Sequence, residues 1–190
     1  MITVGQKFPA FTLQGVDKDN NFIEVSVTEQ YEPLKKEYTV VYFYPKDFTF
    51  ICPTEIAGMD MLVEEANVIG ISGDNEFCKL AWKQDNELIG NIQHSLAADC
   101  GLGLSSKLGI VNEEVGVCYR ATYIIDEEGT VVHESVNHMP LGRNVAEFLR
   151  LVDAYTHVQE KGEVCPANWE EGKDAMEPNA KGTASYLASH

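Results

Sequence analysis

The segment "YTVVYFY", residues 38–44, constrains the fold of this chain more than any other. Its residues are almost all apolar, β-branched or aromatic, and they do not alternate with charged positions. A strand of this kind is typical of the centre of a sheet that is covered on both faces. Pro45 ends the run, and Pro53 fits the first turn of a helix, where its missing N–H group is not needed. The segment therefore predicts a buried strand, a short loop and a helix that begins close to Cys52.

The remaining sequence alternates between strand-like and helix-like patterns. These patterns predict strands at 20–27, 38–44, 68–72 and 93–99, helices at 52–67, 74–88, 104–110 and 144–158, and a hairpin at 119–136. This order indicates an α/β fold, in which a central, mostly parallel sheet carries an added antiparallel hairpin and helices on both faces. The polar residues after position 160 show no sustained period. We therefore expect one domain over residues 1–160 and an extended C-terminal arm over residues 161–190.

The helix predicted at 74–88 leads to a specific expectation about packing. Its apolar residues on one helical face are Phe77, Leu80, Ala81 and Leu88. Because the apolar face of a helix packs on the core, we expect these side chains to be buried. We also expect Cys78 to lie in the core and Trp82 to serve packing instead of chemistry.

The composition excludes several classes of protein. The chain has 14 Lys and Arg against 30 Asp and Glu, for a formal net charge of −16. This balance disfavours nucleic acid and anionic membranes, both of which require clustered cations. The sequence also shows no apolar run of about 20 residues for a membrane span and no signal peptide. We therefore expect a cytoplasmic protein with reduced thiols.

The spacing of the cysteines narrows the chemistry of Cys52. Cysteine occupies positions 52, 78, 100, 118 and 165. No pair is spaced as C-x-x-C, the count is odd, and no cysteine has histidine at the spacing of metal ligands. The pattern thus predicts no metal site and no static disulfide framework. Cys52 is left as either an inert buried thiol or a nucleophile.

The neighbours of Cys52 favour the nucleophile when they are taken together. A helix N-terminus carries a partial positive charge, which stabilises a thiolate. Thr49 is close enough in a tight turn for its hydroxyl to reach the sulfur or a substrate oxygen. Glu55 would oppose a thiolate unless it pairs with an arginine. Taken singly, Thr49 is an ordinary turn residue and Glu55 an ordinary solvated acid of a first helical turn.

The combination Pro45-x-x-x-Thr49-x-x-Cys52 resembles the active-site signature of the peroxiredoxins. The stretch "DFTFICPTE" is similar to the typical 2-Cys branch, which includes the peroxidase component of bacterial alkyl hydroperoxide reductase. The resemblance extends over about residues 3–170, through "FCKLAWKQ", "YRATYIIDEEGTV", "GRNVAEFLRLVDAY" and "GEVCPANW". It implies a thioredoxin-like fold and a thiol-dependent antioxidant peroxidase. The expected substrates are hydrogen peroxide and organic hydroperoxides, and no cofactor is implied.

The resemblance also implies a role for each residue of the motif. Cys52 would be the peroxidatic cysteine, which attacks the peroxide and becomes a sulfenic acid. Thr49 would orient the peroxide and donate a hydrogen bond to it, and Pro45 would shield the pocket. Cys165 would be the resolving cysteine, which forms a disulfide with Cys52.

Three charged residues complete the implied site. Arg120 would stabilise the thiolate and polarise the peroxide, and Glu55 would hold the arginines in place. Arg150 would be a second arginine of this network. Without the motif, Arg120 would be interpreted as a charge at the rim of a strand and Arg150 as a cation on a helix surface.

The partners implied by the resemblance are a second copy of the chain and a reductant. In the typical 2-Cys branch the resolving cysteine comes from the other subunit of a homodimer, and five dimers form a decameric ring. The reductant would be thioredoxin or a dedicated flavoprotein. Two other functions are a holdase that binds unfolded chains, and a thioredoxin-type disulfide oxidoreductase, which the missing C-x-x-C argues against.

Overall fold

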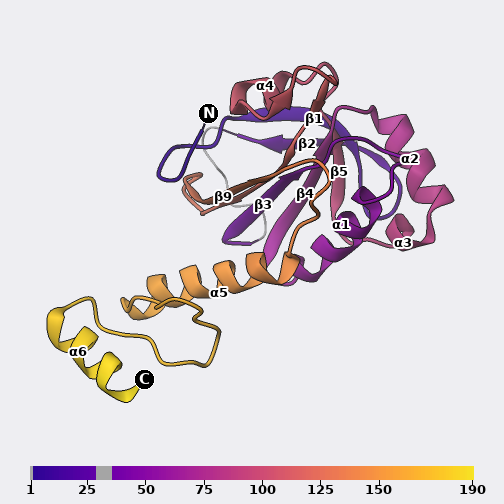
Figure 1. Ribbon diagram of the computed structural model, residues 1–190. Coiled ribbons are helices and arrows are strands. Elements are labelled where there is room, and N and C mark those ends of the chain that lie inside the picture. Colours follow the sequence, from indigo (N-terminus) through magenta and orange to yellow (C-terminus); the bar gives the residue numbers. More distant parts are fainter. Residues whose placement is uncertain (1, 29–35) are drawn as a thin grey trace. The chain divides into compact units, whose positions relative to one another are not determined.

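The structure is a computed structural model that describes residues 2–28 and 36–190 (Figure 1). Contacts divide the chain into two compact units, one up to Val145 and one from Ala146 to His190. The division at residue 160 that the sequence suggests remains a prediction. Within the described residues, no helix is long and apolar enough to cross a membrane.

The first unit contains a seven-stranded sheet, a two-stranded sheet and short helices. Its strands are β1 (Phe11–Val16), β2 (Phe22–Val27), β3 (Tyr38–Phe43), β4 (Ala66–Ser72), β5 (Ser95–Ala98), β6 (Val111–Asn112), β7 (Val117–Cys118), β8 (Arg120–Ile125) and β9 (Val131–Asn137). Its helices are α1 (Cys52–Met59), the 3-10 helix η1 (Asp60–Leu62), α2 (Glu76–Asp85), α3 (Glu87–Gly90) and α4 (Gly103–Leu108). The second unit holds almost all of α5 (Val145–Lys161) and α6 (Ala180–Ser189).

The large sheet has the strand order β2-β1-β5-β4-β3-β8-β9. The pairs β3–β4 and β4–β5 are parallel, and the remaining neighbours are antiparallel. The expected α/β fold with an added hairpin is confirmed, although the sheet is mixed because its parallel part is limited to three strands. Strand β1 was not predicted, since its partly exposed "FTLQGV" carries no continuous apolar run.

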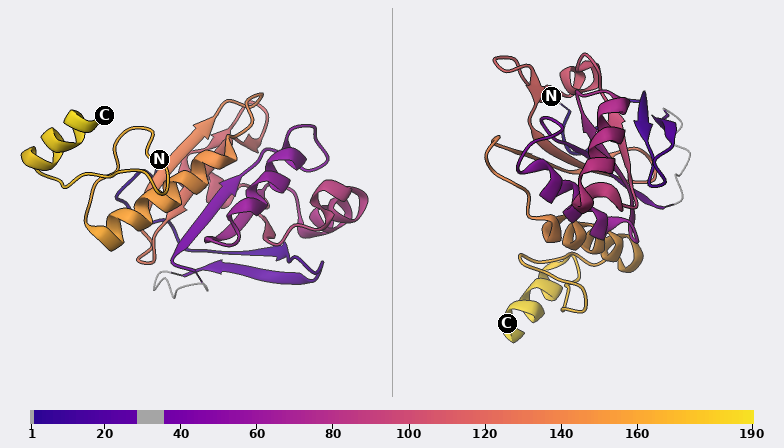
Figure 2. Two further views of the ribbon diagram at one scale, coloured as in Figure 1. Left: turned by 90° about the horizontal axis from the view of Figure 1, so that it is seen from below. Right: turned by 90° about the vertical axis from the view of Figure 1, so that its right-hand side faces the viewer.

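Strand β3 lies in the interior of the sheet, between β4 and β8, and is buried on both faces, as its composition predicts. Val41 and Phe43 belong to a core cluster that includes Leu104 and Leu108 of α4. On the opposite face, the ring of Tyr44, just after β3, lies 6.3 Å from that of Trp82 in α2. In Figures 1 and 2, α4 accordingly lies apart from α1, α2 and α3.

Helix α2 packs through a different face from the one that its apolar residues predict. Phe77 is 64% exposed and Leu88, now in the separate helix α3, is 54% exposed, so the expected burial of this face is wrong. The buried residues of α2 are Lys79, Trp82 and Lys83. Lys79 is buried because Tyr44 and other polar groups accept hydrogen bonds from its ammonium group.

Other details also differ from the expectation. The helix predicted at 52–67 ends at Met59 and continues only as η1 before β4 begins at Ala66. Cys78 is only half-buried, so it is not a core residue. The supposedly extended C-terminal arm contains α6, whose N-terminal amide at Gly182 donates to the side chain of Asn179.

Gly70 in β4 gives a test of this packing, because a Cβ there would lie 2.6 Å from Cζ of Tyr42 and 2.8 Å from Cδ2 of Leu96. Overpacking a core costs about 1–3 kcal/mol, so Gly70→Ala should lower the free energy of unfolding by about 2 kcal/mol in a urea titration. The matched control is Gly103→Ala, where the nearest atom would be Oδ1 of Asp99 at 4.0 Å. That control should change stability by less than about 0.5 kcal/mol, and equal losses in both variants would contradict the packing described.

Candidate active site

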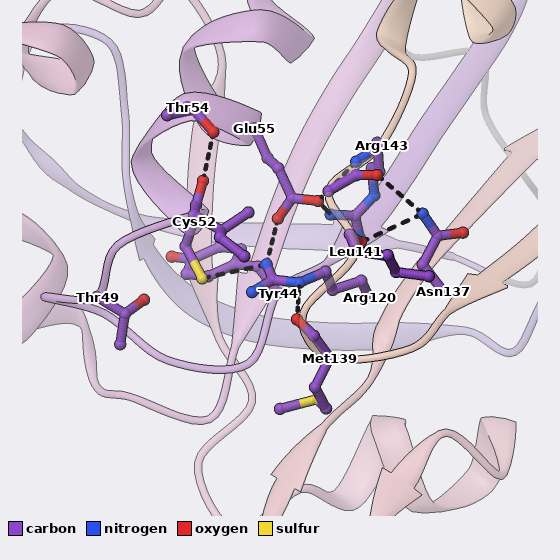
Figure 3. Close-up of polar contacts among 12 residues, drawn as sticks. Tyr44, Thr49, Cys52, Thr54, Glu55, Arg120, Asn137, Met139, Leu141 and Arg143 are labelled. Atoms are coloured by element: carbon purple, nitrogen blue, oxygen red, sulfur yellow. Dashed lines mark hydrogen bonds and ion pairs between the residues drawn. The ribbon is translucent and has the colours of Figure 1, made fainter.

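Cys52 is the first residue of α1 and is only 1% exposed. It follows the loop of residues 44–51, which leaves the central strand β3 (Figure 3). Pro53 lies in the first turn, as predicted, and within the described residues no side chain caps this end of the helix. The helix N-terminus therefore presents its partial positive charge next to the sulfur.

Arg120 of β8 provides the cation next to the sulfur. Its side chain is 6% exposed, and its Nη1 donates to Sγ of Cys52 over 3.3 Å. The same Nη1 donates to Oε2 of Glu55, and Nε donates to the carbonyl of Met139 over 2.7 Å. One guanidinium group thus joins the thiol to the carboxylate and is itself held by the backbone, which confirms that Cys52, Glu55 and Arg120 come together (Figure 3).

Glu55 binds a second arginine, Arg143. Its Oε1 lies 2.7 Å from Nη1 of Arg143 and accepts a hydrogen bond from the Arg143 backbone N–H over 3.1 Å. Nε of Arg143 donates to the hydroxyl of Thr122 over 2.8 Å. Burial lowers the pKa of Arg143, and the carboxylate of Glu55 opposes that shift. Two guanidinium groups and one carboxylate leave one positive charge in excess, which a thiolate at Cys52 would neutralise.

Sequence reasoning missed Arg143, although the quoted segment "GRNVAEFLRLVDAY" contains it. The expected second arginine was Arg150, which the structure places in the second unit. There it forms an ion pair with Glu147 at 2.6 Å and donates to the carbonyl of Trp169 over 3.1 Å. The contact with Glu55 is made by Arg143, and a role for Arg150 in the site remains a prediction.

The loop before Cys52 carries the other two residues of the motif. Pro45 is buried directly after Tyr44. Thr49 is half-buried, and its hydroxyl donates to the carbonyl of Lys46 over 2.8 Å. Figure 3 shows Thr49 in this loop together with Cys52. The roles of Pro45 and Thr49 towards a peroxide remain predictions.

The remaining cysteines differ in their surroundings, and all the described cysteines are free thiols. Cys165 lies in the second unit, where its sulfur contacts the carbonyl of Ala154 at 3.5 Å. Burial raises the pKa of the Cys165 thiol, while Arg150 acts in the opposite direction. Burial raises the pKa of Cys118 to about 12, which makes that thiol a poor nucleophile at neutral pH. Among residues 2–28 and 36–190, no group of three His, Cys, Asp or Glu side chains could hold a metal ion.

These contacts define a class of enzyme chemistry. A thiol at a helix N-terminus, beside a guanidinium group, has the surroundings of a nucleophilic cysteine, which attacks an electrophile. The N–H groups of Arg120 can also stabilise negative charge that develops on a leaving oxygen. The site is therefore that of a thiol-dependent enzyme.

Comparisons with known proteins identify the family. Residues 4–134 match the model of the AhpC/TSA family, and residues 154–189 match the C-terminal domain of 1-Cys peroxiredoxin. Peroxiredoxin-1 of Gekko japonicus is 37% identical, over 98% of this chain and 96% of the relative. The chloroplastic 2-cysteine peroxiredoxin of Chattonella marina var. antiqua is 40% identical, over 98% of this chain and 97% of the relative.

Solved structures give the same result. The reduced 2-Cys peroxiredoxin of Plasmodium vivax is similar with a TM-score of 0.90 and 38% identity, over 99% of this chain and 100% of that one. The AhpC of Enterococcus faecalis is similar with a TM-score of 0.78 and 33% identity, over 87% of this chain and 100% of that one. The chain therefore belongs to the AhpC/TSA family of peroxiredoxins. It has their thioredoxin-like fold and is a thiol peroxidase, as the sequence predicts.

The assignment of the second arginine can be tested by comparing two substitutions. Arg143→Met leaves Glu55 buried with one cation fewer, so the second-order rate of Cys52 oxidation by hydrogen peroxide should fall by about 10²-fold. Arg150→Met breaks a partly exposed ion pair in the second unit and should change this rate by less than about threefold. Stopped-flow fluorescence measures both rates, and a larger loss in Arg150→Met would favour the original expectation.

Proposed function

We propose that Cys52 is the peroxidatic cysteine of this peroxidase. The observation that carries this proposal is the Nη1 atom of Arg120, which lies 3.3 Å from the sulfur and also binds Glu55. A thiolate at Cys52 attacks the terminal oxygen of a hydroperoxide, so an S–O bond forms as the O–O bond breaks. The leaving oxygen takes a proton and departs as water or alcohol, which leaves a sulfenic acid on Cys52. Arg120 stabilises the charge that moves to this oxygen.

Thr49 and Pro45 complete the peroxide pocket in this proposal. The hydroxyl of Thr49 already points its proton to the carbonyl of Lys46, so its oxygen is placed to accept a hydrogen bond from a bound peroxide. A rotation of the hydroxyl would instead let it donate to the peroxide. The buried ring of Pro45 offers no N–H group that could compete for the substrate.

Cys165 is the resolving cysteine in the same proposal. Its thiol attacks the sulfenic acid of Cys52, so an S–S bond forms and water leaves. We place the two cysteines on different subunits of a homodimer, and the dimers in a decamer. Exposed aromatic side chains support an assembly of copies, because Phe50 is 95% exposed and the exposed ring of Phe77 lies 4.9 Å from that of Phe22.

A second thiol protein must reduce the disulfide to complete the cycle. Thioredoxin and a dedicated flavoprotein are the two candidates, and the second would place the chain in the bacterial alkyl hydroperoxide reductase branch, as its peroxidase component. The similarity to the Enterococcus faecalis AhpC supports that branch, and the matched animal and chloroplastic relatives support the wider 2-Cys group. Peroxidase turnover, reconstituted with thioredoxin and with the flavoprotein in separate assays, would show which of them reduces the disulfide. We place the protein in the cytoplasm, where its free thiols stay reduced.

Cysteine substitutions test the proposal directly. Cys52→Ser should abolish peroxide consumption, because no other thiol of the chain combines a helix N-terminus with a guanidinium group among the described residues. Cys165→Ser should consume about one equivalent of peroxide per chain and then stop, without a disulfide-linked dimer on a non-reducing gel. Cys118→Ser is the matched control and should behave as wild type. Full peroxide consumption by Cys52→Ser would reject the proposal.

A further inference from the structure

The reaction cycle requires a movement that the reduced structure does not contain. Cys52 is 1% exposed, and its sulfur accepts a hydrogen bond inside the protein. A disulfide needs two sulfur atoms at about 2.05 Å, so a partner sulfur cannot reach this position while α1 is intact. The residues that carry Cys52 must therefore rearrange before the disulfide forms. The structure contains a buried polar anchor before this segment, which we define as residues 48–59, and a partly buried one after it.

We propose that Lys79 and His94 are positioning residues of the peroxidase reaction. Lys79 holds Asp47, and His94 holds Asp60, so that the two fix the ends of the segment that carries Cys52. The rearrangement is then confined to the residues between the anchors. This inference rests on the proposed disulfide step.

The first anchor surrounds Asp47, just before the segment. The side chains of Asp47 and Lys79 are both fully buried, with Nζ 3.4 Å from Oδ1. Nζ also donates to the hydroxyl of Ser72 over 2.6 Å, and this hydroxyl donates to Oδ1 of Asp47 over 2.9 Å. The backbone N–H of Asp47 donates to Oδ2 of Asp74 over 2.7 Å. Separating such a pair leaves uncompensated buried charge, so Asp47 resists displacement.

The second anchor surrounds Asp60, just after the segment. Its Oδ1 lies 2.8 Å from Nδ1 of His94 and accepts from the backbone N–H of Gln93 over 2.6 Å. Nε2 of His94 lies 2.8 Å from the hydroxyl of Tyr42 in the central strand. Burial lowers the pKa of His94, although Asp60 opposes the shift, and thus favours the neutral ring. A neutral ring donates from Nδ1 to the carboxylate and accepts at Nε2 from Tyr42, which satisfies both nitrogens.

The segment between the anchors is exposed at its start, whereas Ile56 and Met59 near its end are fully buried. Phe48 and Phe50 are 53% and 95% exposed, and Phe48 has a positive φ of 53°. Helix α1 has only eight residues, and a helix of this length is marginal without tertiary contacts. The main polar contacts that hold α1 in place are those of Glu55 with the two arginines. Loss of those contacts would release the start of the segment, through the first turn of α1, without moving Asp47 or Asp60.

Hydrogen–deuterium exchange of the full chain tests the inference, because each anchor contains a reporter amide. The amides of Asp47 and Gln93 both donate to carboxylates of the anchors. In the peroxide-oxidised disulfide form, amides of α1 should exchange at least about tenfold faster than in the reduced protein. The Asp47 and Gln93 amides should stay within about twofold of their reduced rates. Loss of protection at both reporters in the wild-type disulfide form would overturn the proposal.

Two variants of His94 separate positioning from a general structural role. His94→Leu removes the donor to Asp60, whereas His94→Asn keeps an amide donor near the place of Nδ1. In His94→Leu, the rate of disulfide formation relative to sulfenic acid formation should rise about fivefold, and Gln93 should lose protection. His94→Asn should keep this ratio within about twofold of wild type. An unchanged ratio in His94→Leu would also overturn the proposal, since a purely structural role would lower both rates together.

Lys79 needs a paired substitution because Lys79→Met alone leaves a buried carboxylate without its cation. The double variant Lys79→Met/Asp47→Asn removes both charges, and in it the backbone amide of residue 47 should lose protection in the disulfide form. Non-reducing gels of the same samples report whether the Cys52–Cys165 disulfide forms. Its absence would count against the proposed function. Exchange in the reduced protein would still test the anchors, because local opening of α1 must leave both reporter amides protected.

Discussion

The carboxylate of Glu55 is the interaction on which the active site depends. It lies in α1 and binds Arg120 from β8 and Arg143 from the segment before α5, so it joins three parts of the first unit. A buried guanidinium group is costly unless a carboxylate pairs with it, and Glu55 pairs with two. The same pairing leaves one positive charge in excess beside Cys52. The contacts that hold α1 against the sheet are therefore also the contacts that place positive charge beside the sulfur of Cys52.

A second buried cation explains the main difference between the predicted and observed packing. The apolar period of residues 74–88 predicts a buried Phe77, but Lys79 and Trp82 occupy the interior. The apolar period of a sequence shows only which positions of the helix carry apolar side chains. It carries no information about Tyr44 and Asp47, which approach Lys79 from another part of the chain and satisfy its ammonium group. Long-range polar contacts of this kind override a local apolar pattern.

Features set by local sequence could be predicted, whereas features set by long-range contacts could not. Local signals predicted the strand at 38–44 and the helix start at Cys52. The resemblance identified Arg120, which lies in a quoted motif and is the first residue of β8. It did not distinguish Arg143 from Arg150, since both occur in one quoted segment and only the fold shows which one reaches Glu55. Strand β1 was missed because it carries no continuous apolar run, and its hydrogen bonds come from the neighbouring β2 and the distant β5.

The overall charge of the chain and the local charge of the site have opposite signs. The formal net charge of −16 disfavours nucleic acid and anionic membranes as partners, because those contacts are made by exposed groups. At Cys52 the charged groups are Glu55, Arg120 and Arg143, which are buried. They lie within about one hydrogen-bond length of the sulfur or of each other, where salt screens them little. Acidic groups on the surface are screened over roughly 10 Å at ordinary ionic strength. A strongly acidic protein can thus hold a cationic thiol site, provided that the arginines are buried and that one carboxylate, Glu55, keeps them in place.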